Sequence, residues 1–124
     1  MEESLKVYLA QHNTVLVRGI DIYPGLQYLK SIAPEFQKFT SDDEGVCQIL
    51  VALGFTLDSS GIYVAHGDGS DIEELTKNKG ILWYFQDRWP KGHGRYLDRY
   101  FDLVVGFLDN KLSGIKKSRF GQEV

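Results

Sequence analysis

Apolar residues recur at helical spacing in the first third of the chain. In residues 3–11, Leu5 and Leu9 lie four positions apart on one face, which predicts a short opening helix. In residues 24–33 the apolar side chains recur every three positions, which predicts a second helix. Between these two segments, the β-branched run Thr14–Val17 favours an extended strand.

A nearly continuous apolar run, Val46–Leu53, marks the centre of the chain. Ser41 and Glu44 precede it at the spacing of a capping box, in which two side chains satisfy free N–H groups at the start of a helix. Gly54 follows it, where a helix often ends on a residue with positive φ. These signals predict a central helix between Ser41 and Gly54.

Apolar and polar residues alternate on both sides of Asp58–Gly61, a segment of turn-forming composition. The alternating apolar residues are Phe55, Leu57, Ile62 and Val64. This pattern predicts two short strands joined by a tight turn, a β-hairpin over residues 55–64.

Three further helical patterns follow the predicted hairpin. Ser70 and Glu73 repeat the capping-box spacing and predict a helix through Leu75. The dense apolar content of residues 81–89 favours more helix, and residues 95–112 predict a long last helix. The apolar stripe of that last helix consists of Leu97, Phe101, Val104, Leu108 and Leu112. The sequence therefore predicts an α+β fold that is mostly α, a compact helical domain with one short β-hairpin.

The composition adds limits on organisation and partners. The 124 residues fit one domain, residues 1–124, because single hydrophobic cores seldom split below about 250 residues. Seventeen acidic and fourteen basic residues leave a formal charge of −3, which disfavours nucleic acid and anionic membrane surfaces as partners. Cys47 is the only cysteine, and the acidic N-terminus lacks the features of a secretory signal. We therefore expect a cytoplasmic location or another reducing intracellular compartment.

One segment, His66–Asp71, has the composition of a metal site, with a histidine and two aspartates. A calcium-binding EF-loop that began at Asp68 would need glutamate at its twelfth position, where the chain has Lys79. Helix-entry capping is the favoured interpretation of this segment, and core packing is the favoured interpretation of Cys47. We thus predict no catalytic residue, no bound metal and no cofactor, and a binding role is favoured over an enzyme.

Aromatic residues form a second stripe on the predicted last helix. Tyr96, Tyr100 and Phe107 belong to it, and a helix that is apolar on two faces is either buried twice or covered by a partner. The basic segment Arg88–Arg99 overlaps this stripe, with acidic residues interspersed. It is typical of a solvated helix junction and is also compatible with an acidic protein partner.

The middle of the chain resembles the PUB (PUG) domain, a family of ubiquitin-pathway adaptors. The resemblance covers residues 28–76. Its segments are Ala33–Gln37, Glu44–Phe55, Gly61–Val64 and Asp71–Leu75, which match a step ending in phenylalanine, a helix ending in Gly-Phe, a hairpin and a further helix. The asparagine that the family places three residues before that phenylalanine is replaced by Ala33. In the family this asparagine belongs to the groove for the C-terminal tail of the valosin-containing AAA ATPase.

The resemblance implies a protein–protein interaction module that binds a peptide tail or protein partner, such as that AAA ATPase tail. We expect Phe36, Phe55 and Tyr63 to contact the tail. The alternatives are a small inhibitor or immunity-type protein that uses Tyr96, Tyr100 and Phe107, and a metal-dependent hydrolase that uses His66, Asp68 and Asp71.

Overall fold

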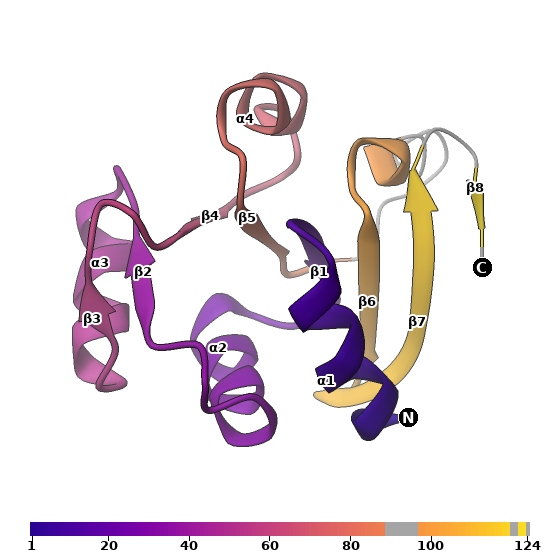
Figure 1. The fold of residues 1–124 in the computed structure, drawn as a ribbon, viewed down its shortest axis with the longest axis horizontal. Coiled ribbons are helices and arrows are strands. Elements are labelled where there is room, and N and C mark those ends of the chain that lie inside the picture. The colour runs from indigo at the N-terminus through magenta and orange to yellow at the C-terminus, as the bar shows by residue number, and fades with distance from the viewer. Residues whose placement is uncertain (89–96, 120–121, 124) are drawn as a thin grey trace.

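A largely parallel β-sheet forms the centre of the molecule in the computed structural model, which describes residues 1–88, 97–119 and 122–123 (Figure 1). The helices are α1 (Glu2–Gln11), α2 (Ile22–Ile32), α3 (Glu44–Ala52) and α4 (Ile72–Asn78). The strands are β1 (Thr14–Arg18), β2 (Lys38–Thr40), β3 (Thr56–Leu57), β4 (Ile62–His66), β5 (Leu82–Gln86), β6 (Leu103–Leu108), β7 (Lys111–Arg119) and β8 (Gln122–Glu123). Their order is β3-β2-β4-β5-β1-β6-β7-β8, and a 3₁₀ turn at residues 97–100 precedes β6.

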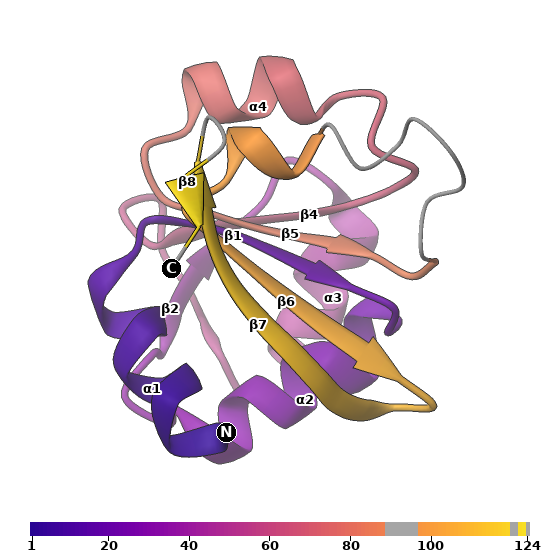
Figure 2. The same cartoon turned by 90° about the vertical axis from the view of Figure 1, so that its right-hand side faces the viewer.

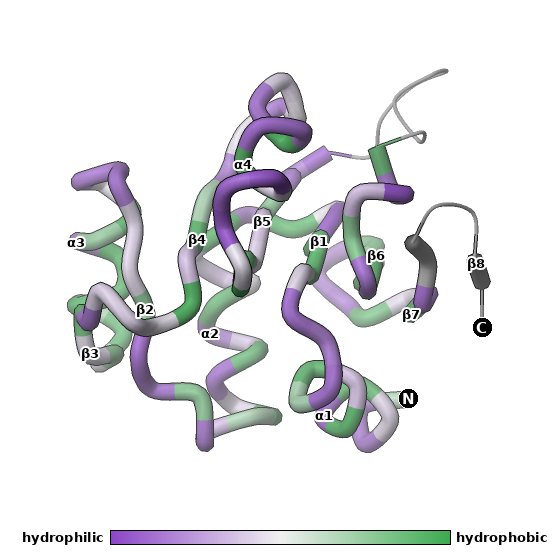
Figure 3. Tube along the Cα trace, turned by 45° about the horizontal axis from the view of Figure 1, so that its top comes forward, coloured by the Kyte–Doolittle hydropathy of each residue, from purple (hydrophilic) through white to green (hydrophobic). Residues whose placement is uncertain are grey.

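The adjacent strands β1 and β5 are inner strands of the sheet, and every residue of both is buried. They pair in parallel, and β6 pairs in parallel with the other side of β1. A parallel strand that is covered on both faces reads as a continuous apolar run. In Figure 3, where green marks hydrophobic residues, β1 and β6 are largely green. In both β1 and β5 the apolar run stops at the last residue, which is Arg18 in β1 and Gln86 in β5.

Helices cover both faces of this sheet (Figure 2). Side chains alternate along a strand, so Val15 and Val17 pack with α1, α2 and α3, whereas Leu16 packs with α4 and the 97–100 turn. Arg18 follows Leu16 by two positions, and its side chain therefore emerges on the α4 face.

The predicted fold, a mostly helical domain with one hairpin, is wrong, because the chain has a mixed α/β fold around a mostly parallel sheet. The elements that the structure confirms are the helices predicted at residues 3–11, 24–33 and 46–53, the helix predicted from Ser70 through Leu75, which is α4, and the strand at Thr14–Val17. The N-cap of α4 is Asp71 and makes no side-chain cap hydrogen bond, so the predicted capping box at Ser70 and Glu73 is not formed. Gly54 has a φ of 89°, as its place after α3 predicted. The cap of α3 differs from the prediction: Asp43, not Ser41, accepts a hydrogen bond from the N–H of Val46.

The predicted hairpin at residues 55–64 is also wrong. β3 and β4 do not pair with each other, because β2 lies between them and pairs with both in parallel. Gly61 passes directly against β2, where an added Cβ would come within 2.5 Å of the Lys38 carbonyl carbon. β2 is only three residues long, too short to give a pattern in the sequence, yet its Phe39 is fully buried.

The helices predicted at residues 81–89 and 95–112 are replaced mainly by strands. Residues 82–86 form β5, and β6 and β7 form an antiparallel hairpin. Residues 89–96 lie outside the described part of the chain. The hairpin turns at Asp109 and Asn110, whose φ values of 51° and 61° are those of a tight turn that matches strand twist.

This turn gives a test of the hairpin against the predicted helix. Because glycine adopts positive φ freely, Asn110→Gly should leave the free energy of unfolding unchanged or raise it by up to about 1 kcal/mol. Asn110→Val should lower it by roughly 1–2 kcal/mol, because a β-branched residue resists positive φ. Urea denaturation measures both changes. Lys111→Gly, one residue later in β7, is the control and should lower the free energy of unfolding. If residues 95–112 formed a helix, Asn110→Gly would instead lower it more than Asn110→Val.

Candidate functional site

The carboxyl ends of β1 and β5 meet at a topological switch point of the sheet. The connection from β1 enters α2 on one face, whereas the 97–100 turn that follows β5 packs on the other face. Parallel sheets bind ligands in the crevice outside adjacent strands whose connections diverge in this way. The last residues of the two strands, Arg18 and Gln86, lie directly opposite each other here.

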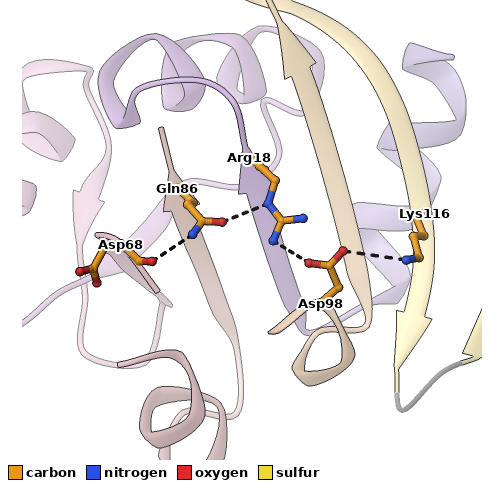
Figure 4. Close-up of polar contacts among 5 residues, drawn as sticks. All are labelled: Arg18, Asp68, Gln86, Asp98 and Lys116. Carbon is orange, nitrogen blue, oxygen red and sulfur yellow. Dashed lines mark hydrogen bonds and ion pairs between the residues drawn. The ribbon is translucent and has the colours of Figure 1, made fainter. Parts of the chain in front are cut away.

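Arg18 is a buried cation, only 1% exposed. Its Nε donates to Gln86 Oε1 over 3.0 Å, and its Nη2 lies 2.6 Å from Asp98 Oδ1 (Figure 4). Burying an unpaired guanidinium is very costly, so these two partners are what allow a charge at the end of the central strand.

Asp98 links the turn to the sheet. It lies in the 97–100 turn, is 7% exposed, and has its second oxygen, Oδ2, 3.9 Å from the Nζ of Lys116 in β7. The side chain of Lys116 is 42% exposed and reaches the same carboxylate from the outside. Two cations from the sheet, Arg18 and Lys116, thus share one carboxylate from the turn.

Gln86 is held from its other side by the loop after β4. Its Nε2 donates to the backbone oxygen of Asp68 over 3.1 Å. The hydroxyl of Tyr84, two residues earlier on the same face, accepts from the N–H of Gly69 and donates to Asp71 Oδ1. A chain of polar contacts therefore crosses the sheet from this loop through Gln86, Arg18 and Asp98.

The segment His66–Asp71 braces this network. Asp68 Oδ1 accepts from the N–H of Ser70, a bond that lowers the pKa of the Asp68 carboxyl. Asp71 binds Tyr84, and His66 instead approaches Asp43 at 3.9 Å. Across residues 1–88, 97–119 and 122–123, no three histidine, cysteine or acidic side chains gather as a metal site would require.

A cavity of about 250 Å³ lies beside the pair formed by Arg18 and Asp98. Its lining consists of Arg18, Asp98, Val104, Gly106, Gly114, Ile115 and Lys116. Gly106 is in register with Arg18 on one side and with Gly114 on the other, so two successive neighbours of Arg18 have no side chain. A Cβ at Gly114 would meet nothing within 4 Å. The two glycines therefore leave open space next to a buried cation.

The residues predicted to contact a peptide tail lie elsewhere. Phe36 is half-buried against Trp83, with 5.5 Å between ring centroids, and lines a groove of about 420 Å³ at the amino ends of the strands. Phe55 is buried against Phe39 in the core. Tyr63 is half-buried in β4, with the Nζ of Lys79 4.4 Å from its ring centroid.

The residues predicted to form an inhibitory face are also separated. Phe107 is fully buried and packs edge-on against Tyr28. Tyr100 is half-buried in the 97–100 turn on the other face of the sheet, and Tyr96 lies outside the described residues. A partner would reach Tyr100 without reaching Phe107, because the sheet lies between them.

Sequence reasoning missed Arg18, Gln86 and Asp98. The signal for the first two was a polar residue at the end of an apolar run, which has meaning only once both runs are known to be neighbouring parallel strands. Asp98 carried no signal of its own, because it was placed on a predicted helix.

No family model, curated protein or solved structure matches the chain. The resemblance to the PUB family stays a prediction, although the helical fold that it implied is not observed. Among the described helices, none combines the length and apolar character needed to cross a bilayer.

The Tyr84 hydroxyl gives a pH test of the braced loop. Burial, then the hydrogen bond to Asp71, raises the pKa of Tyr84 above its usual value. Above pH about 10 the unfolded chain loses this proton while the folded chain keeps it, so the stability falls as pH rises. Tyr84→Phe should make this fall shallower by up to about 1.4 kcal/mol per pH unit, measured by urea denaturation between pH 8 and 11.5.

Two half-buried tyrosines, and the loss of a hydrogen bond at neutral pH, also affect the stability of Tyr84→Phe. The pKa values of Tyr28 and Tyr63 are also raised, chiefly by burial, so some pH dependence should persist. At neutral pH, Tyr84→Phe should cost about 1–3 kcal/mol, because the Gly69 N–H loses its acceptor. The exposed Tyr23→Phe serves as the matched control. An unchanged slope in Tyr84→Phe would show that Tyr84 does not hold its proton in the folded state.

Proposed function

We propose that this protein is a binding module that recognises the carboxylate or phosphate group of a ligand at the carboxyl end of its parallel sheet. The observation that carries the proposal is the cavity beside Arg18, kept open by Gly106 and Gly114 and flanked by Lys116. It combines a fixed guanidinium, a second cation and free space beside the carboxyl end of β1, on the side of β6 and β7.

The local charge supports an anionic ligand. Arg18, Lys116 and Asp98 together leave one net positive charge at the cavity, although the whole chain carries −3. Arginine presents a planar fork of N–H donors that suits carboxylate and phosphate oxygens. Here the fork is held in orientation by Gln86, so little side-chain freedom is lost when a ligand binds.

The size of the cavity supports recognition of a small group. Pockets that enclose whole drug-sized ligands measure about 300–1,000 Å³, and this one is smaller, at about 250 Å³. The recognised group is therefore a small anion or the charged end of a larger ligand. A peptide tail, the partner class predicted from the sequence, carries such a group as a C-terminal carboxylate or an acidic side chain.

Gly114→Val tests this function without removing a charge. Because a Cβ at Gly114 meets open space and β-branched residues favour strands, the variant should keep or raise the melting temperature. Its side chain should fill the cavity and abolish anion binding. Titration with sodium phosphate and with sodium formate, at ionic strength held constant with sodium chloride, should shift the amide resonances of Gly106 and Gly114 saturably in the unmodified protein.

The matched control is Gly80→Val. A Cβ at Gly80 also meets nothing within 4 Å, and Gly80 precedes β5 at the opposite end of the sheet. This variant should bind both anions as the unmodified protein does. Absence of saturable shifts with either anion in the unmodified protein, or equal binding by Gly114→Val, would overturn the proposed function.

A further inference from the structure

We infer that Asp98 is an internal counter-ligand, and that the external ligand of this site is a carboxylate that takes its place between Arg18 and Lys116. The inference rests on the proposed function and names its ligand class. In this inference Asp98 has a second role besides stabilising the fold. Its carboxylate occupies the two cations until a ligand carboxylate replaces it.

The contacts of Asp98 show which chemistry fits. One oxygen lies 2.6 Å from Arg18 Nη2, and the other lies 3.9 Å from Lys116 Nζ. One planar carboxylate thus spans two cations that come from separate strands, β1 and β7 (Figure 4). A ligand carboxylate offers the same two oxygens in the same plane, whereas a phosphate is tetrahedral and has more oxygens to accommodate.

Arg18 has a side-chain partner other than Asp98, and Lys116 has a backbone fixed by strand pairing. Arg18 ends the central strand, and its Nε bond to Gln86 fixes the guanidinium. Gln86 is in turn held by the backbone oxygen of Asp68. Lys116 lies in the part of β7 that pairs with β6, where it is in register with Val104. The guanidinium of Arg18 and the backbone of Lys116 should therefore keep their places when the carboxylate of Asp98 moves away.

Asp98, unlike the two cations, does not lie in a strand of the sheet. It belongs to the short turn at residues 97–100, outside the sheet. Its backbone oxygen accepts from the N–H of Phe101 over 3.1 Å, and this bond does not involve the side chain. Its side chain borders the cavity beside Gly106 and Gly114, so space for an incoming group lies next to the carboxylate to be replaced.

The experiment compares formate binding by the unmodified protein and by Asp98→Asn. The asparagine side chain keeps the shape of Asp98 but lacks its charge, so it competes poorly for the two cations. The affinity for sodium formate, measured by the Gly106 and Gly114 amide shifts at constant ionic strength, should rise at least about tenfold, which corresponds to about 1.4 kcal/mol. Asp87→Asn, an exposed acid directly after Gln86, is the matched control and should show no gain.

Asp98→Ala provides a second measurement through stability. Removing the carboxylate leaves the buried Arg18 with one fewer counter-charge and should lower the melting temperature by about 10 °C. Sodium formate supplies the missing carboxylate and should restore a large part of this loss saturably, whereas sodium chloride at equal ionic strength should not. The unmodified protein should show a much smaller formate effect.

The outcomes separate this inference from the proposed function. If the unmodified protein binds formate but Asp98→Asn shows no gain, Asp98 is not a counter-ligand and the binding function stands. If the gain appears with phosphate and not with formate, the carboxylate class is wrong and the function again stands. If neither the unmodified protein nor Asp98→Asn binds either anion, both the proposed function and this inference are wrong.

Discussion

The burial of one guanidinium, that of Arg18, organises the carboxyl edge of this sheet. Arg18 ends a strand whose other residues are buried in apolar surroundings, so its charge cannot be left to water. Its partners come from the neighbouring strand, through Gln86, and from the 97–100 turn, through Asp98. The loop after β4 is drawn into the same network, because Gln86 needs an acceptor for its own N–H. A single buried cation thus links a strand, a turn and a loop that are distant in sequence.

The change from parallel to antiparallel pairing explains why there is space beside this cation. β6 pairs in parallel with β1, and β7 then returns alongside β6 as a tight hairpin. The hairpin needs no covering helix to make its connection, unlike parallel strands. Gly106 and Gly114 are in register with Arg18, so the next two positions across the sheet from Arg18 have no side chain. The cavity is therefore a product of topology and of two glycines together.

The sequence predicted local structure well and long-range structure poorly. α1, α2 and α3 have the spacing or end signals of helices, and the positive φ of Gly54 followed from its place after an apolar helix. The stripe from Leu97 to Leu112 has helical spacing by coincidence, because LVVGFL is a buried strand and the turn at Asp109 and Asn110 reverses the chain. β2 could not be found at all, because three residues hold no periodicity. Since the site joins β1, β5 and the 97–100 turn, a wrong assignment of β5 and of that turn hid it.

The net charge of the chain did not predict a buried cation beside a cavity. A formal charge of −3 predicts no general attraction of polyanions, but it describes the whole chain and not a buried position. Charges inside a protein are screened less by salt, and Arg18 acts over the few ångströms of its own cavity. An acidic protein can therefore hold a buried cation at a cavity, provided that the cation has a neutral partner such as Gln86 and a carboxylate such as that of Asp98. The selectivity of the site that we propose then depends on shape and hydrogen bonding rather than on overall charge.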